Sequence, residues 1–321
     1  MLDLIIRNGT VIDGTGSPKF KADIGIQDDL VIRIGEVTDS ASSEINASGS
    51  IVTPGFIDLH THSDNSFLID PLADSKLTQG VTFELMGNCG MSFCAPLNSE
   101  TIDDFNNRTN KYDPDYKPGW ATMDGYLSAL ENTGSTINIA AQVGHGTVRR
   151  SVMGMEPRMP TPEQLDRMKG LIADSLDAGA LGMSTGLWYA PGSYSLADEV
   201  IAVTQPAADR GKLYSSHIRS EADDLSGLFP AHAEAIEIGR RTGARIQISH
   251  VKAVGPQFWG RGHELIEGME RARNEGIDVA GDQYPYEWSS TGFSGAMFPR
   301  WALVGGRQAT LDRLADDDTR S

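Results

Sequence analysis

The chain has 321 residues, of which 39% are hydrophobic and 22% charged, a composition typical of globular proteins. Lys and Arg total 27 against 44 Asp and Glu, so the formal net charge is −17. A negative field of this size repels nucleic acids and anionic membranes, and we expect neither as a partner. The N-terminus has no signal-peptide pattern, no apolar run is long enough for a membrane span, and the two cysteines are too few for a disulfide framework. These features favour a cytoplasmic protein.

The first 53 residues are predicted to form short strands and turns without helices. Residues 2–13 alternate around the turn signal Asn8-Gly9, which predicts one hairpin, and residues 22–37 predict a second. We interpret residues 1–53 as the N-terminal part of a small β-sandwich.

From residue 54 onward, short apolar runs alternate with helical stretches. Helix signals include a capping box at Thr161–Gln164 and an apolar face over residues 231–241 before Gly243. Alternation of this kind predicts an α/β fold with parallel strands and right-handed crossovers. The seven runs are FIDLH, VTFELMG, INIAAQVGH, ALGMSTG, KLYSSHI, RIQISHV and DVAGDQY. Seven units fit either a doubly wound sheet or an incomplete (β/α)8 TIM barrel over residues 54–321.

Histidines gather at the ends of these runs. Functional groups of barrel enzymes cluster at the C-terminal ends of the strands, so this placement favours the barrel. Five of the seven histidines follow the pattern, namely His60, His62, His145, His217 and His250. The other two, His232 and His263, lie in or beside predicted helices, and we expect them to face solvent or to cap a helix.

His60 and His62 are two residues apart on the first predicted strand. Side chains at this spacing on a strand point to one face, so the two imidazoles could hold a single cation. The pair follows directly on the predicted all-β segment, in the stretch GFIDLHTHSD. We therefore interpret it as a metal-binding pair.

Cys89 and two further histidines are candidates for a second set of ligands. Cys89 lies in a glycine-flanked loop, MGNCGM, after the second run, and a thiolate is a good zinc ligand. His217 and His250 end the fifth and sixth runs, one βαβ unit apart, so they should be neighbours. Three ligands with one open position are typical of catalytic zinc. Cys94 has no usual metal spacing and is expected to be inert.

The combination of motifs resembles the D-aminoacylase (N-acyl-D-amino-acid deacylase) branch of the amidohydrolase superfamily. The similarity extends from residue 1 to about residue 295 and includes HTH, GNCG, SHIRSE, SHVK, GHGTVR, LGMSTGLWYAPG and DQYPY. It implies a metal-dependent hydrolase with a barrel fold. Its substrates would be small molecules, N-acyl-D-amino acids, in which it cleaves the linear amide bond.

The resemblance also implies roles for individual residues. It implies one tight Zn²⁺ site and a second, weaker site that shares the thiol. The tight site would use Cys89, His217 and His250, and the weaker site His60 and His62 with Cys89 bridging. Lys252, Tyr284 and Ser290 would meet the carboxylate and carbonyl region of the substrate. Lys252 lies two residues after His250, so on a strand both would face the same side.

The sequence departs from the pattern of related enzymes in two places. The fourth run, GMSTGL, offers no lysine to bridge two metals, which points away from enzymes that open cyclic amides, such as hydantoinases and dihydroorotases. The family's acid/base, an Asp at the tip of the eighth strand, has no visible counterpart after DQYPY. We therefore expect a C-terminally truncated barrel with about seven of eight strands, and we assign no catalytic residue.

Three functional hypotheses remain open from the sequence. The first is zinc-dependent hydrolysis of N-acyl-D-amino acids, in which the D configuration depends on the resemblance alone and the chain could be an inactive fragment. The second is a non-catalytic metal-binding or scaffold protein on the same barrel, which the missing Asp favours. The third is a cyclic-amide hydrolase, which the missing lysine disfavours.

Overall fold

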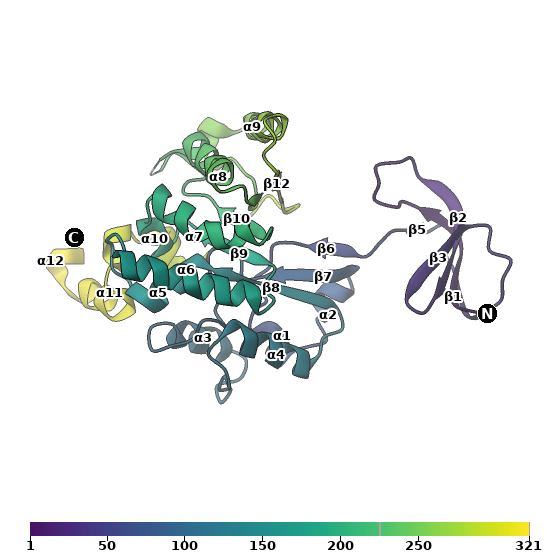
Figure 1. Cartoon of the computed structure of the whole chain (residues 1–321), viewed down its shortest axis with the longest axis horizontal. Coiled ribbons are helices and arrows are strands. Elements are labelled where there is room, and N and C mark those ends of the chain that lie inside the picture. Colours follow the sequence, from purple (N-terminus) through teal and green to yellow (C-terminus); the bar gives the residue numbers. More distant parts are fainter. Residues whose placement is uncertain (225, 321) are drawn as a thin grey trace. The chain divides into compact units, whose positions relative to one another are not determined.

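The computed structural model describes residues 1–224 and 226–320 and divides the chain into two compact units, Met1–Phe56 and Ile57–Ser321 (Figure 1). The first unit contains strands only, and the second contains a parallel sheet with its helices. Among the described residues, no helix is both long and apolar enough to cross a membrane.

The first unit is one sheet in the order β3-β2-β1-β4, with β5 also pairing with β1. Its strands are β1 (Leu2–Val11), β2 (Phe20–Gln27), β3 (Leu30–Gly35), β4 (Ala41–Asn46) and β5 (Ile51–Val52). The hairpin predicted around Asn8-Gly9 is wrong. β1 runs through this point with a bulge between Ile6 and Gly9, and Asn8 takes a φ of 62° there. The second predicted hairpin is correct, since β2 and β3 pair antiparallel.

The second unit is built on a seven-stranded sheet in the order β12-β11-β10-β9-β8-β7-β6. Its strands are β6 (Phe56–Asp58), β7 (Val81–Met86), β8 (Asn138–Gly144), β9 (Gly182–Gly186), β10 (Leu213–His217), β11 (Arg245–Ile248) and β12 (Val279–Gly281). Each strand lies within one of the seven predicted runs. The pairs from β7 to β12 are all parallel. Strands in sequence order therefore present their C-terminal ends at one edge of a curled sheet.

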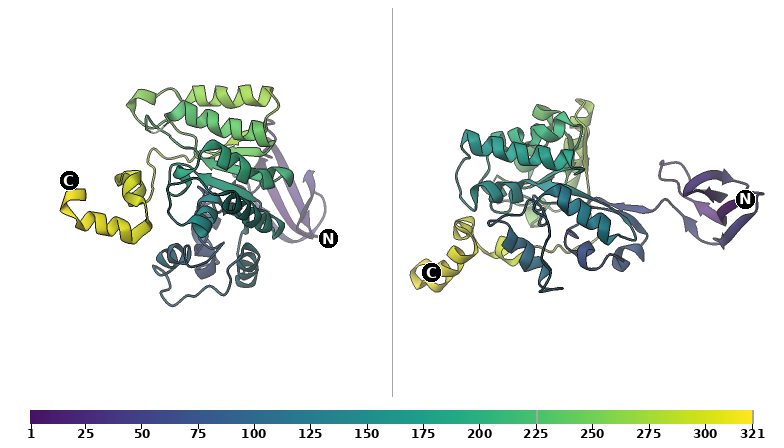
Figure 2. Two further views of the ribbon diagram at one scale, coloured as in Figure 1. Left: turned by 60° about the vertical axis from the view of Figure 1, so that its left-hand side comes forward. Right: turned by 60° about the horizontal axis from the view of Figure 1, so that its bottom comes forward.

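The helices that follow β8 to β11 pack against one another in chain order along one side of the sheet (Figure 2). Up to β12 the helices are α1 (Ser66–Ile69), α2 (Asp74–Leu77), α3 (Ile102–Thr109), α4 (Met123–Thr133), α5 (His145–Met153), α6 (Pro162–Asp177), α7 (Ala197–Asp209), α8 (Leu228–Thr242) and α9 (Gly262–Asn274). The capping box predicted at Thr161–Gln164 is confirmed at the start of α6. Apolar faces of α6 to α9 enter one large core cluster.

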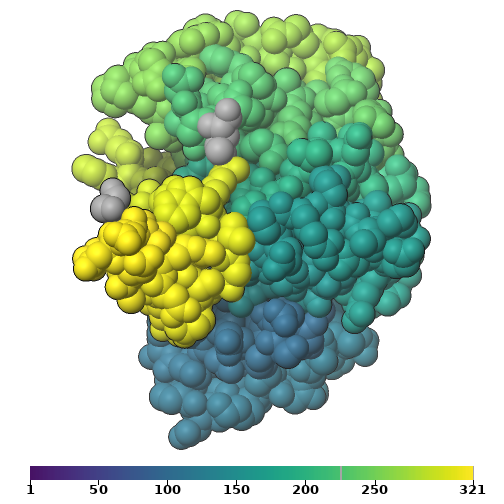
Figure 3. All heavy atoms as spheres, turned by 90° about the vertical axis from the view of Figure 1, so that its left-hand side faces the viewer, coloured from purple at the N-terminus to yellow at the C-terminus, as the bar shows by residue number. Residues whose placement is uncertain are grey.

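The C-terminal segment lies against the teal part of the chain in Figure 3, where it appears in yellow. It consists of short helices after β12: α10 (Phe293–Met297), a 3-10 turn at Arg300–Leu303, α11 (Gly306–Ala315) and α12 (Asp317–Arg320). Several of its side chains line a cavity together with residues of the β7 and β9 loops.

The predictions for His145 and His232 need correction. His145 does not end a strand: it is the first residue of α5, fully buried, with Nε2 3.1 Å from Glu199 Oε1. His232 was expected to face solvent or to cap a helix, but it lies inside α8 with only 4% of its surface exposed. In both cases tertiary packing, which the local pattern does not report, decides the environment. His263 is exposed, and its Nδ1 lies 3.0 Å from the Gly260 carbonyl oxygen.

Candidate metal centre

Cys89 is held in a tight loop after β7. Its backbone takes a φ of 55°, in the left-handed region that is unusual for a residue with a side chain, and its side chain is buried. The loop packs closely on β9, because a Cβ atom on Gly186 would collide with the Cys89 carbonyl oxygen. The amide of Gly90 donates to Ser184 Oγ at 3.0 Å. These contacts fix where the thiol lies.

Three imidazole nitrogens converge on this thiol. Cys89 Sγ lies 3.3 Å from His60 Nε2, 3.5 Å from His217 Nδ1 and 3.6 Å from His250 Nε2. Zinc bonds of about 2.3 Å to sulfur and 2.0–2.1 Å to nitrogen, at a tetrahedral angle, separate the two ligand atoms by about 3.5 Å. The spacing of the side chains therefore fits a tetrahedral metal ion.

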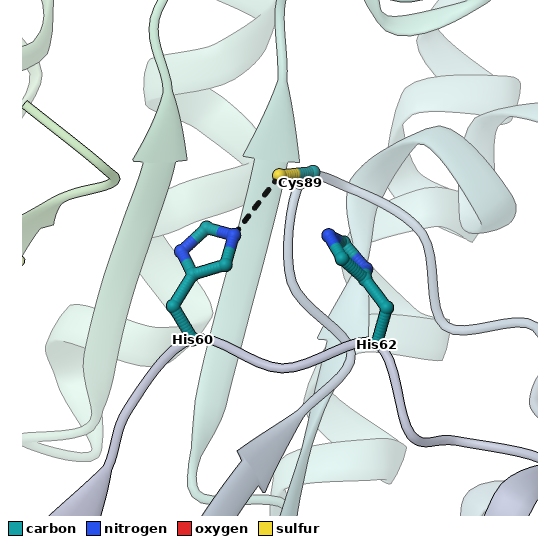
Figure 4. A group of neighbouring side chains, drawn as sticks. All are labelled: His60, His62 and Cys89. Carbon is teal, nitrogen blue, oxygen red and sulfur yellow. Dashed lines mark hydrogen bonds between the residues drawn. The ribbon is translucent and has the colours of Figure 1, made fainter. Parts of the chain in front are cut away.

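The candidate ligands form two groups that share Cys89. One is Cys89 with His217 and His250, and the other is Cys89 with His60 and His62; within each group the ligand atoms all lie within 4.8 Å of one another. Figure 4 shows the second group, in which both rings lie beside the sulfur. The structure thus brings together the five side chains named from the sequence as metal ligands.

The placement of His60 and His62 on a strand was wrong, although both side chains reach the thiol as a metal-binding pair would. β6 ends at Asp58, so the two histidines lie in the loop beyond it and not on a strand. Their rings stand edge to face at 76°, and both extend from this loop toward Cys89 (Figure 4). The loop curves around Cys89, which brings both rings to the sulfur.

Burial sets the charge of these side chains. It raises the pKa of the Cys89 thiol, with a further contribution from Glu221, and it lowers the pKa of His217 and His250. Neutral imidazoles are the form that binds a metal, and a buried thiol becomes a thiolate most readily beside a cation. The chemistry of the side chains therefore fits a resident zinc ion as well as their spacing does.

Two carboxylates that the sequence motifs did not single out lie behind the histidines. Glu221 Oε1 is 2.9 Å from His250 Nδ1 and 3.9 Å from His217 Nε2. Asp282 Oδ1 is 3.3 Å from His60 Nδ1. Burial alone would raise the pKa of Glu221, but hydrogen bonding with His250 and the neighbouring positive groups lower it to about 2. Each of these three imidazoles thus has one nitrogen toward the thiol and the other toward a carboxylate.

Lys252 lies against the metal centre in a different way from that expected. β11 ends at Ile248, and His250 has a φ of 37°, so His250 and Lys252 do not share a strand face. Lys252 Nζ nevertheless reaches His250, donating to its carbonyl oxygen at 3.2 Å, and it donates to Glu221 Oε1 at 2.6 Å.

The other two residues named as substrate contacts lie apart from each other. The Tyr284 ring is half-buried with Lys252 Nζ 5.6 Å from its centre. Ser290 is exposed and lines the large cavity, of about 1160 Å³, that also includes Cys89 and His62.

The chain belongs to the amidohydrolase family, whose profile matches residues 43–300. It is 40% identical over 292 residues to an N-acyl-D-glutamate deacylase of Alcaligenes xylosoxydans xylosoxydans, which covers 90% of this chain and 58% of that protein.

Solved structures agree with this membership. An N-acyl-D-glutamate deacylase from Bordetella bronchiseptica, complexed with zinc and a phosphonate inhibitor that mimics the tetrahedral intermediate, aligns with a TM-score of 0.80 at 40% identity. A D-aminoacylase with a binuclear metal centre aligns with a TM-score of 0.81 at 36% identity. Both alignments cover 89% of this chain and 59% of the other. The chain therefore spans less than two thirds of the length of these relatives.

Proposed function

We propose that this chain binds zinc and acts in hydrolysis of the amide bond of N-acyl-D-amino acids, which gives a carboxylate and a free D-amino acid. The observation that carries the proposal is the convergence of three imidazole nitrogens on the Cys89 thiol at 3.3–3.6 Å. The deacylases that the chain resembles act on substrates of this class by name, and one of them was solved with zinc. A reducing compartment such as the cytoplasm would keep the thiol available.

The proposed tight site consists of Cys89, His217 and His250, and the weaker site of His60 and His62 with Cys89 shared. Bound zinc would polarise the scissile carbonyl and activate a water molecule. The five side chains would hold the ion, and their burial keeps the imidazoles neutral. The cavity lined by Cys89 and His62 would admit the substrate. Carboxylates near the metal, Glu221 and Asp282, already contact the histidines, and we assign no general acid/base among the described residues.

For the fold, we propose that the curled sheet is part of a (β/α)8 barrel and that residues 1–53 are part of a β-sandwich. The sequential order of the seven strands, which pair in parallel from β7 to β12, supports the barrel. Exposed apolar side chains on β3 support the sandwich, since a second sheet layer would cover those on one face. Four large side chains of β3 are more than half exposed, namely Leu30, Val31, Ile32 and Ile34.

Lys252 is proposed to receive the substrate's carboxylate. An ammonium has three N–H donors, and Glu221 and the His250 carbonyl accept two of them, so one remains for a substrate. Tyr284, against the same ammonium, and Ser290, on the cavity wall, are proposed to add hydrogen bonds.

Lys252→Met should weaken binding of N-acetyl-D-amino acids to the zinc-loaded protein by about 1.5–3 kcal/mol, the value of a charge-assisted contact. The matching N-acetyl-D-amino amides lack the carboxylate and should lose little. Calorimetric titration of acid and amide with both proteins measures the difference. Equal losses for acid and amide would contradict the assignment of Lys252.

Ligand comparison separates the proposed substrate from its rival. β9 is buried along its whole length and carries no lysine, which disfavours a cyclic-amide hydrolase with a lysine-bridged metal pair. The zinc-loaded protein should bind N-acetyl-D-amino acids more tightly than their L enantiomers or a hydantoin of the same side chain. Preference for the hydantoin would overturn the proposed function, and zinc binding without affinity for any of these amides would favour a metal-binding protein without this activity.

A further inference from the structure

Two oppositely charged side chains reach the same nitrogen of His250. Glu221 Oε1 lies 2.9 Å from Nδ1, and Lys252 Nζ also lies 2.9 Å from Nδ1. The two groups contact each other at 2.6 Å. On the other side of the ring, Nε2 faces Cys89 Sγ at 3.6 Å. The protonation of Nδ1 therefore depends on which neighbour it bonds.

A neutral imidazole carries one proton, on either nitrogen, and the two forms differ in what Nε2 can do. If Nδ1 carries the proton, it can donate to Glu221, and Nε2 has a free lone pair on the side of Cys89. If Nε2 carries the proton, Nδ1 accepts from Lys252, and Nε2 cannot bind a metal. Glu221 thus favours the metal-binding tautomer of His250, and Lys252 favours the other one.

We propose that Glu221 is a positioning residue that selects the metal-binding tautomer of His250 against Lys252. The proposal rests on the proposed metal site. Glu221 acts in two ways: its oxygen accepts the proton of Nδ1, and its charge engages the ammonium that would otherwise donate to that nitrogen. Carboxylates that orient metal-bound histidines in this manner contribute substantially to metal affinity.

The surroundings of Glu221 support a fixed position. Its side chain is 15% exposed, and its backbone carbonyl accepts from the amide of Val254 at 2.8 Å, which joins the loop after β10 to the loop after β11. The same oxygen that faces His250 lies 3.9 Å from His217 Nε2. One carboxylate therefore lies behind both histidines of the proposed tight site.

Asp282 offers a matched control. It lies behind His60 as Glu221 lies behind His250, at 3.3 Å from Nδ1, with His60 Nε2 toward the same thiol. Among the described residues, no lysine or arginine forms an ion pair with Asp282. Asp282 Oδ1 also accepts from the His250 backbone amide at 2.6 Å, an acceptor that Asp282→Asn keeps. Asp282→Asn therefore removes the carboxylate charge behind His60 without releasing a competing ammonium.

The first test needs no metal. Nitrogen-15 NMR of the metal-free protein, with His250 assigned by His250→Gln, reports the proton on each ring nitrogen. We expect Glu221→Ala to shift His250 from Nδ1–H toward Nε2–H, and Glu221→Ala with Lys252→Met to shift it part of the way back. An unchanged tautomer in Glu221→Ala would overturn the proposal, whether or not the protein binds zinc.

The second test measures zinc affinity by competition with a chelator. We expect Glu221→Ala to weaken the tight site roughly 10–100-fold, and Glu221→Gln, which keeps an oxygen acceptor, to weaken it less. Lys252→Met should leave the affinity unchanged or higher, and adding it to Glu221→Ala should recover part of the loss, because the competing donor to Nδ1 is gone while the oxygen acceptor is still missing. Asp282→Asn should leave the tight site within a few-fold of wild type.

The double variant decides between positioning and simple destabilisation. Glu221→Ala could instead lose zinc affinity only because an unpaired ammonium destabilises the fold. In that case the unfolding temperature will fall together with the zinc affinity, and the proton of His250 will stay on the same ring nitrogen. That result, or a double variant as weak as Glu221→Ala, would contradict the proposal. A wild-type protein without tight zinc would contradict the proposed function instead, and the NMR comparison would still decide the role of Glu221.

Discussion

The two groups of candidate ligands share one thiol but differ in how the protein holds them. In the group with His217 and His250, the histidines come from the ends of neighbouring parallel strands, or just beyond, and their side chains are 5% and 11% exposed. In the group with His60 and His62, both histidines come from one loop beyond β6, and His62 is exposed. Glu221 lies behind the imidazoles of the first pair, whereas the Asp282 carboxylate faces the His60 imidazole and also accepts from the His250 backbone amide.

This difference predicts unequal affinities. A ligand on a packed strand end loses little freedom when it binds a metal, whereas an exposed loop side chain must first be ordered. Burial also strengthens the attraction between the thiolate and the ion, because water screens it less. The group with His217 and His250 should therefore bind zinc tightly, and the group with His60 and His62 should bind a second ion more weakly.

The largest effect is expected from Cys89→Ala, because the shared thiol is a ligand in both groups. Structural zinc sites with four ligands bind with roughly 10–16 kcal/mol, so each ligand contributes about 3–4 kcal/mol, or two to three orders of magnitude in affinity. Metal analysis of the purified, folded variant should show neither the tight nor the weak ion. Cys94→Ala is the matched control, since this buried thiol donates to the Asp64 carbonyl oxygen away from both groups. Full zinc in Cys89→Ala would refute the shared site.

A large but selective effect is expected from His217→Ala or His250→Ala. Each change removes one ligand of the tight group and leaves the three side chains of the other group. The zinc affinity of the tight site should therefore fall by about two orders of magnitude, while the weak site still binds. Titration with zinc should then show one weak phase only. His232→Ala removes a buried histidine that belongs to neither ligand group and should retain the tight phase. Loss of zinc in His232→Ala alone would show that the assay reports folding and not ligation.

The sequence predicted which side chains meet at the thiol because strand order and strand ends follow from local patterns. His217 ends β10, and Cys89 follows β7 in a glycine-flanked loop, so parallel pairing is enough to bring their loops to one edge. His145 shows the limit of this reasoning. A shift of one residue moves it from the strand end into the first turn of α5, where its ring packs on Glu199.

The second layer of the site could not be predicted in the same way. Glu221 follows His217 by four residues in SHIRSE, but it lies in an irregular loop whose course depends on a contact with Val254 on the next loop. Asp282 was assigned to the seventh run, yet its place behind His60 depends on how the loop around His60, 222 residues earlier, curves around the thiol. Lys252 reaches His250 only because His250 takes a left-handed φ, which strand periodicity does not include. These positions depend on tertiary contacts between loops.

The smallest effects on the zinc affinity of the tight site are expected from His60→Ala and His62→Ala. These two variants test directly whether the two ligand groups differ in affinity. Neither histidine belongs to the group with His217 and His250, so the tight phase should weaken less than about tenfold, although His60 lies 3.3 Å from the shared sulfur. The weak phase should disappear in both variants. His60→Ala should have the larger effect on the tight phase, because it also removes a partner of Asp282, whose carboxylate accepts from the backbone amide of the tight-group ligand His250. A two-phase zinc titration of wild type and both variants measures this. If His60→Ala removed the tight phase while His217→Ala left it in place, the ranking of the two groups would be reversed, and the loop beyond β6 would hold the principal metal ion.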